Sequence, residues 1–205
     1  MRQSLTTLAA VALTGSLVGA IGLAVTGQVP AIDAAGLALA DNVRRPALDA
    51  AFGTITWLGS IVVLLPLALV VALRVAPRLG WRAATLAPAV LLATTALAQV
   101  GKLVFERARP DLYPALTTMP ADASFPSAHA AQAAAVALAL LMHSSLAGRQ
   151  RAVLAAGLGF LVGAVALSRI YLQVHFPSDV VAGLLLAVAV VIGLRALPFW
   201  RGAKL

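Results

Sequence analysis

The sequence predicts an all-α integral membrane protein, a bundle of six transmembrane helices. Of its 205 residues, 61% are hydrophobic and only 11% are charged, which is too apolar for a soluble core inside a polar surface. The apolar residues also fall into blocks of about 17 to 22, the length that crosses a hydrocarbon layer about 30 Å thick. By length we expect residues 1–205 to form a single membrane domain.

Six apolar blocks define the expected spans. They run approximately over residues 5–26, 54–73, 83–101, 127–146, 152–168 and 179–198. The first block could instead be a signal peptide, because Arg2 precedes it. A block of about 20 apolar residues is long for that role, and no clear small-x-small cleavage site follows, so we favour a membrane span. Six spans place both termini on the same side of the membrane.

The basic residues predict how the bundle is oriented. With the N-terminus in the cytoplasm, most basic residues are inside and all seven acidic residues are outside, as the positive-inside bias requires. The inner set is Arg2, Arg74, Arg78, Arg82, Arg149, Arg151, Arg195, Arg201 and Lys204, and the outer set is Arg44, Arg45, Lys102, Arg107, Arg109 and Arg169. We expect Arg44, Arg45 and Arg107 to pair with outer acids, so the other three need another explanation. The net charge of +8 does not indicate nucleic-acid binding, because the basic residues are not clustered on one face.

Two outer connections differ in pattern. Residues 29–52 place Ile32, Leu39 and Val43 on one helical face with Asp33 elsewhere, which predicts a short helix lying in the outer interface. Residues 105–126 contain four prolines and no helical period, which predicts a cover over the outer end. The cytoplasmic segments "RVAPRLGWR" and "HSSLAGRQR" are expected to be turns.

Three groups of polar residues converge on the outer ends of the third to sixth spans. They are Lys102 and Arg109; Ser127, Ala128 and His129; and Ser168, Arg169, His175 and Asp179. Guanidinium and ammonium groups suit a phosphate dianion. The free backbone N–H groups at the start of the fourth span add a second anion site. This end of the bundle is therefore expected to bind phosphate.

Two histidines give this site a chemistry beyond binding. Imidazole can act as nucleophile and as acid near neutral pH. Asp179 follows His175 by four residues and can accept its Nδ1 hydrogen, which turns the Nε2 lone pair toward phosphorus. No metal site is expected, because the three cations would repel a metal ion and the chain has no cysteine.

The three groups resemble the signature motifs of the type 2 phosphatidic acid phosphatase family. "KLVFERARP" is similar to the first motif, "PSAH" to the second and "SRIYLQVHFPSD" to the third, with Ala128 at a position that is usually glycine. This family also includes bacterial phosphatidylglycerophosphate and undecaprenyl pyrophosphate phosphatases and, more distantly, vanadium haloperoxidases. The resemblance implies a phosphatase of the bacterial cytoplasmic membrane that needs no cofactor, faces outward, and acts on a phosphorylated lipid such as these or phosphatidate.

The resemblance also implies a role for each residue. His175 would attack phosphorus to form a phosphohistidine, Asp179 would orient it, and His129 would protonate the leaving group and later activate water. The phosphoryl oxygens would be held by Lys102, Arg109, Arg169, Ser127 and the backbone N–H groups of Ala128 and His129.

Other interpretations remain open at this stage. The protein could be a non-hydrolytic binder or transporter of lipid phosphates, or a haloperoxidase. The sequence names neither the lipid nor the oligomeric state.

Several polar residues near the motifs also have plainer explanations. Ser127, and Ser178 with Asp179, could be helix N-caps. Asp111 and Asp122 are expected to be solvated, and Glu106 could pair with Lys102 if the helix continues. The remaining histidine, His143, is expected about 21 Å away, at the other membrane face.

Overall fold

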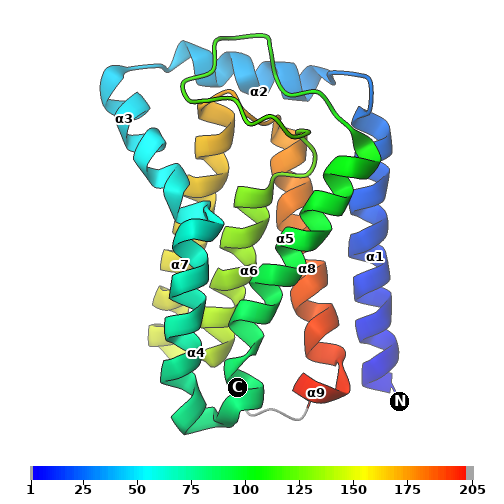
Figure 1. The fold of residues 1–205 in the computed structure, drawn as a ribbon, viewed down its shortest axis with the longest axis vertical. Helices are drawn as coiled ribbons and strands as arrows, with labels where there is room; N and C mark the ends of the chain where they lie inside the picture. Colours follow the sequence, from blue (N-terminus) through cyan, green and yellow to red (C-terminus); the bar gives the residue numbers. More distant parts are fainter. Residues whose placement is uncertain (1, 202–205) are drawn as a thin grey trace.

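The computed structural model describes residues 2–201, and all regular secondary structure in this range is helical (Figure 1). The elements are α1 (Arg2–Val25), α2 (Ala31–Asn42), α3 (Pro46–Ile55), the 3₁₀ helix η1 (Thr56–Gly59), α4 (Ile61–Ala84), α5 (Leu86–Phe105), α6 (Ala128–His143), α7 (Gly148–Tyr171), α8 (Pro177–Ala196) and α9 (Pro198–Arg201). Lys204 lies outside the described residues, as does the side chain of Arg2. The predicted orientation therefore depends on the other basic residues.

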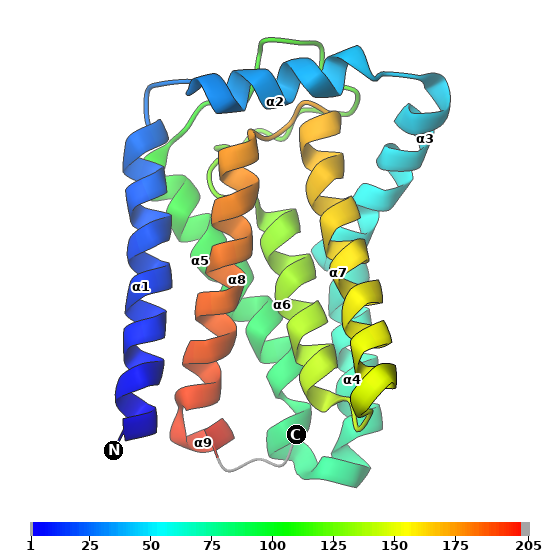
Figure 2. The same cartoon turned by 180° about the vertical axis from the view of Figure 1, so that it is seen from behind.

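Within residues 2–201, five helices, α1, α4, α5, α7 and α8, are long and apolar enough to cross a membrane. The sixth apolar helix, α6, has 16 residues, which gives about 24 Å and falls short of a hydrocarbon core of about 30 Å. It lies in the middle of the bundle, in contact with α4, α5, α7 and α8 (Figures 1 and 2). The predicted all-α membrane bundle is confirmed, with α6 as a short central helix.

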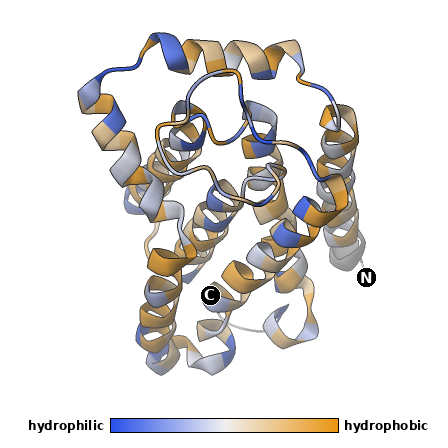
Figure 3. Ribbon diagram, turned by 45° about the horizontal axis from the view of Figure 1, so that its top comes forward, coloured by the Kyte–Doolittle hydropathy of each residue, from blue (hydrophilic) through white to orange (hydrophobic). Residues whose placement is uncertain are grey.

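The bundle is apolar on its outside as well as in its core. Large side chains such as Leu23, Val62 and Phe160 are exposed on outward helix faces. Figure 3 shows hydrophobic residues along most of the length of the helices, with hydrophilic segments mainly near the two ends of the bundle. This distribution suits helices that are solvated by lipid.

Small residues let the helices approach the centre closely. Ala130, Ala131, Ala135 and Ala139 of α6 are fully buried. Gly183 of α8 faces the start of α6, where a Cβ atom would lie 2.5 Å from the Ser127 carbonyl oxygen. The position of α8 against α6 therefore depends on the absence of a side chain at this point.

Two predicted boundaries of the second span were wrong. Residues 56–59 form the 3₁₀ helix η1, and the span begins at Ile61, after Ser60, whose hydroxyl accepts the Val62 N–H at 3.3 Å. At its other end α4 continues to Ala84 through the segment predicted as a turn. Only Gly80 departs from helical geometry there, with φ 81° and ψ 162°, a conformation that glycine adopts without a steric penalty.

The opposite end of the bundle carries the interface helix and the cover. Residues 29–52 contain two helices, α2 and the start of α3, where one was predicted. α2 lies across the end of the bundle, and the loop after α5, residues 106–127, folds over the same end (Figure 1). Ile32 and Leu39 are exposed on α2, whereas Asp33 is fully buried. α9 and the start of α1 lie together at the far end.

Gly183→Ala should lower the free energy of unfolding by about 1–3 kcal/mol, because the new methyl group would collide with backbone that cannot move aside. Gly193→Ala on the same helix is the matched control, since a Cβ there meets only Val11 at an ordinary 3.7 Å. That variant should be neutral or stabilised by up to about 1 kcal/mol. Thermal unfolding in detergent measures both, and equal behaviour of the two would contradict the close α6–α8 approach.

Candidate active site

The three groups of predicted site residues meet at the end of the bundle beneath α2 and the loop. Lys102 is in the last turn of α5 and Arg169 in the last turn of α7. Ser127 precedes α6, and Asp179 is in the first turn of α8. α5 and α7 thus end where α6 and α8 begin, so alternating helix directions bring residues from distant parts of the chain together.

His175 is fixed by its backbone as well as by its ring. The N–H groups of Val174 and His175 both donate to the Arg169 carbonyl at 3.2 Å. Its Nδ1 lies 3.3 Å from Asp179 Oδ2, and its Nε2 lies 3.3 Å from an Arg109 nitrogen. Because a guanidinium can only donate, Nε2 carries the lone pair and Nδ1 the proton.

The surroundings of His175 keep it neutral. Its side chain is 2% exposed, and this burial lowers its pKa to about 3. Asp179 opposes the shift, while the charges of Arg169 and Arg109 reinforce it. At neutral pH the ring is uncharged, and its Nε2 lone pair is available for bonding.

Asp179 collects donors from three other parts of the site. Its Oδ2 accepts the Phe176 N–H at 2.9 Å and the Ser124 hydroxyl, and its Oδ1 accepts from Arg107 at 2.5 Å. The alternative role of Ser178 or Asp179 as N-cap of α8 does not apply by position, because the helix begins after Phe176. Asp179 instead accepts the N–H of that residue from the third helical position, as in a capping box. Its carboxylate is thereby held beside the His175 ring.

Lys102 and Arg109 share one carboxylate, that of Asp122 in the cover loop. Lys102 Nζ lies 2.9 Å from Asp122 Oδ2, and Arg109 lies 2.6 Å from Oδ1. Asp122 was expected to be a solvated loop residue, and Glu106 was expected to pair with Lys102 only if the helix continued. The helix instead ends at Phe105 and Glu106 turns to φ 43°, so the i, i+4 register between Glu106 and Lys102 is lost.

Several buried polar atoms near the site have no hydrogen-bond partner within residues 2–201. They include Ser127 Oγ, Arg107 Nε and Arg169 Nε, whose residues are 0%, 4% and 4% exposed. Arg169 also donates to Thr56 Oγ1 at 2.5 Å. Ser127 stands at the N-cap position of α6, but its hydroxyl makes no capping hydrogen bond. Buried donors without partners are costly, and a bound oxyanion satisfies them.

His129 is the second residue of α6 and is partly buried. This burial, reinforced by the positive charges of Arg169, Lys102 and Arg109, lowers its pKa. Ala128 begins the same helix, whose first turn leaves backbone N–H groups free of helical partners. The other histidine of this helix, His143, lies at its far end, where Nε2 is 2.8 Å from the Ala83 carbonyl. His143 is therefore separate from the site.

Sequence reasoning missed three residues that contact the site. Ser124 bonds Asp179 and lies 3.4 Å from His175 Nδ1, and Thr56 bonds Arg169. Arg107 pairs with outer acids as predicted, but one of them is Asp179. The sequence signal was the place of Arg107 within the first motif and of Ser124 just before the second, because their partner Asp179 is 72 and 55 residues away in the chain.

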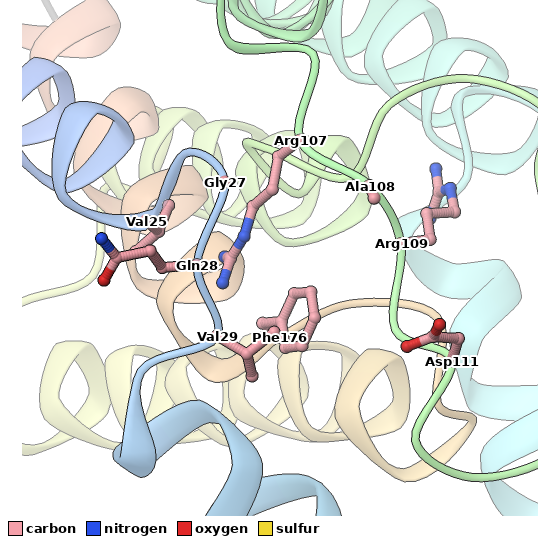
Figure 4. Close-up of a pocket in the computed structure, with 9 residues that line it drawn as sticks. All are labelled: Val25, Gly27, Gln28, Val29, Arg107, Ala108, Arg109, Asp111 and Phe176. Carbon is pink, nitrogen blue, oxygen red and sulfur yellow. The ribbon is translucent and has the colours of Figure 1, made fainter.

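A pocket of about 250 Å³ adjoins the site between the α1–α2 connection and the loop (Figure 4). Arg107 extends from the loop toward Phe176 and the connection, whereas Arg109 lies away from them. Gln28 and Asp111 add further polar groups to the lining. This pocket offers polar surface next to Arg109.

Known proteins resemble this chain in both sequence and fold. A family model described as the PAP2 superfamily matches residues 83–203. Decaprenylphosphoryl-5-phosphoribose phosphatases from two strains of Mycobacterium tuberculosis, CDC 1551 / Oshkosh and ATCC 25618 / H37Rv, are each 43% identical over 101 residues. That stretch is 46% of this chain and 50% of theirs, so the chain spans about half the length of the curated relatives it matches.

Two solved structures share the architecture. The transmembrane PAP2 type phosphatidylglycerolphosphate phosphatase from Bacillus subtilis superposes with a TM-score of 0.75 at 26% identity, over 91% of this chain and 93% of that one. LpxE from Aquifex aeolicus gives 0.65 at 25% identity, over 83% and 98%. The matched family region holds all three groups of site residues and more than half of the chain, so the protein belongs to the PAP2 superfamily, as the motifs predicted.

Proposed function

We propose that the protein hydrolyses a phosphomonoester or pyrophosphate on a membrane lipid through a phosphohistidine formed on His175. The observation that carries this proposal is the His175 ring itself. Its Nδ1 proton faces Asp179, its Nε2 lone pair faces the guanidinium of Arg109, and it is neutral. A neutral imidazole that is oriented through one nitrogen and available at the other is the arrangement of an activated nucleophile.

Substrate phosphate would bind among the cations of the site. Lys102, Arg109 and Arg169 supply positive charge, and the unpartnered Ser127 hydroxyl and the N–H groups of Ala128 and His129 supply further donors. These groups would stabilise the negative charge on the equatorial oxygens as the phosphoryl group transfers. The pocket beside Arg109 would receive the polar part of the head group.

The reaction would proceed in two displacements. His175 Nε2 forms a bond to phosphorus as the bond to the leaving oxygen breaks. His129 gives that oxygen a proton, which it takes up when the bound phosphate offsets the burial and the neighbouring cations that otherwise lower its pKa. Asp179 stabilises the positive charge that the phosphorylated imidazole gains. Water then attacks phosphorus, His129 takes up its proton, and the P–N bond breaks to release phosphate and neutral His175.

A non-hydrolytic binder of lipid phosphates is the weaker alternative. Binding alone needs the cations, whereas the aspartate that orients His175 and the second histidine serve only chemistry. The phosphatase relatives support the same choice.

The substrate class is proposed from the relatives' names. One set acts on decaprenylphosphoryl-5-phosphoribose and the other on phosphatidylglycerolphosphate, so both polyprenyl and glycerolipid phosphates belong in the assay, with undecaprenyl pyrophosphate and phosphatidate. We also propose that the site faces outward from a bacterial cytoplasmic membrane. Arg74, Arg78 and Arg82 near the end of α4, with Arg195 in the last turn of α8, lie at the end opposite the site, which is the arrangement of the positive-inside bias.

His175→Ala should reduce phosphate release from these lipids by at least about a thousandfold, because it removes the nucleophile. His143→Ala is the matched control at the other end of the bundle and should keep most of the activity. Thermal unfolding in detergent verifies that both variants fold, and trapping of an acid-labile phosphoprotein should succeed with the His143 variant alone. Activity retained by a folded His175→Ala would refute the assignment.

Asp122→Asn should tighten the binding of vanadate by about two- to tenfold, because it removes the carboxylate that competes for Lys102 and Arg109. The Asp122 side chain is 43% exposed, which keeps the expected gain small. Asp41→Asn removes the same charge from α2, where the carboxylate pairs with Arg44 and does not line the pocket beside Arg109, and should change little. Weaker vanadate binding by Asp122→Asn would mean that Asp122 positions the cations and does not compete with the ligand.

The free energy of unfolding should fall as the pH is lowered from about 6.5 toward 3. An unfolded His175 takes up a proton near pH 6.5, whereas burial lowers its pKa in the folded protein to about 3, so protons favour the unfolded state across this window. Despite partial burial, bonds from Lys102 and Arg109 lower the pKa of Asp122 to about 2, so its contribution changes only below about pH 4. His175→Gln should show a shallower fall between pH 6.5 and 4, and identical slopes would contradict the buried neutral imidazole.

A further inference from the structure

A buried carboxylate outside the motifs reaches the active site. Asp33 is on α2, the helix across the end of the bundle, and is 0% exposed. Isolated ionised carboxylates are not buried without compensation, because loss of hydration costs several kcal/mol per ion. Its partners therefore indicate what its charge does.

Asp33 connects to Asp179 through Arg107. The Arg107 guanidinium lies 2.7 Å from Asp33 Oδ2 and 2.5 Å from Asp179 Oδ1, using a different nitrogen for each. It also stacks over the Phe176 ring, 4.0 Å from the centroid, as the approach of the two side chains in Figure 4 illustrates. One rigid planar cation thus bridges two carboxylates, one on α2 and one beside the nucleophile.

Asp33 also binds the first turn of α8 directly. Its Oδ1 accepts the Ser178 N–H at 2.9 Å, and its Oδ2 accepts the Ser178 hydroxyl at 2.5 Å. A carboxylate at a helix N-terminus satisfies a free N–H group and interacts favourably with the helix dipole. Asp33 therefore fixes the turn that carries Asp179, from another helix.

Two further contacts seat α2 on the segment that holds His175. Gln173 donates to the Leu37 carbonyl at 2.9 Å. Gly36 lies against Pro177, where a Cβ atom at position 36 would be 2.5 Å from the ring. α2 is thus docked along residues 173–178, on both sides of His175.

The charges along this chain matter for the reaction. Asp33, Arg107 and Asp179 carry minus, plus and minus, which leaves a net negative charge next to His175. Without the charge of Asp33, Arg107 would be paired with Asp179 alone. Asp179 would then offer less stabilisation to the positive charge that the ring gains when Nε2 bonds to phosphorus.

We propose that Asp33 and Arg107 are positioning residues of the phosphoryl transfer, which fix Asp179 and set the charge that it presents to His175. The inference rests on the proposed function. It assigns α2 a part in catalysis, although α2 lies outside all three motifs. Both residues act through Asp179, so the loss should fall on the chemical step and leave substrate binding by Lys102, Arg109 and Arg169 intact.

Asp33→Asn tests this directly, because asparagine keeps the volume and an acceptor for the Ser178 N–H but removes the charge. We expect kcat for a water-soluble short-chain phosphatidate to fall about 10- to 100-fold, with KM within about twofold of the wild-type value. Asp41→Asn is the matched control on the same helix, where the carboxylate pairs with Arg44 at 3.1 Å. It should leave both constants unchanged.

A double-variant cycle separates this coupling from a general structural effect. If Asp33 acts through Arg107, Asp33→Asn should cost little in a protein that already carries Arg107→Gln, or Arg107→Lys if the glutamine variant does not fold. Equal costs of Asp33→Asn in both backgrounds would overturn the coupling, as would a rise in KM without a fall in kcat.

Assays of the wild-type protein distinguish a failure of the proposed function from a failure of the positioning role of Asp33. If it releases no phosphate from any lipid of the panel, the proposed function fails, and the role of Asp33 fails with it. If the wild-type protein is active and Asp33→Asn matches it, only the positioning role is overturned.

Discussion

The buried carboxylate of Asp179 is the point on which the outer end of the molecule depends. It accepts hydrogen bonds from the Phe176 backbone, Ser124 and Arg107 while it faces His175 Nδ1. These donors come from the α7–α8 connection and the cover loop, so one anion joins segments that are far apart in the sequence. A charge buried this deeply is stable only when all its partners are in place, which makes the local geometry cooperative.

The charged residues at this end of the bundle form two groups. On one side, the carboxylates of Asp33 and Asp179 surround Arg107 and leave a negative excess beside the His175 ring. On the other side, Lys102 and Arg109 share only Asp122, and Arg169 donates to the neutral hydroxyl of Thr56. Orientation of the ring and attraction of an anion are therefore handled by separate sets of charges on opposite sides of one histidine.

The bundle supplies the precision that such a site needs. Alanines along α6 and Gly183 on α8 let the helices that carry His129 and Asp179 approach until backbone meets backbone. α2 and the loop then close the end that lipid cannot cover. Because the side chains stand on helix ends that are packed against one another, their relative positions follow from the core and not from the loop alone.

The sequence by itself determined the class of fold, the family and the list of motif residues. Hydropathy blocks reflect the thickness of a bilayer, and His175 and Asp179 lie only four residues apart, so both are local properties that a chain displays without folding. Only the tertiary structure decided where α4 begins, which carboxylate Lys102 meets, and that Asp33 is buried. These outcomes depend on contacts between residues such as Asp33 and Arg107, 74 positions apart, and no periodicity along the chain records which distant partner will satisfy a buried charge.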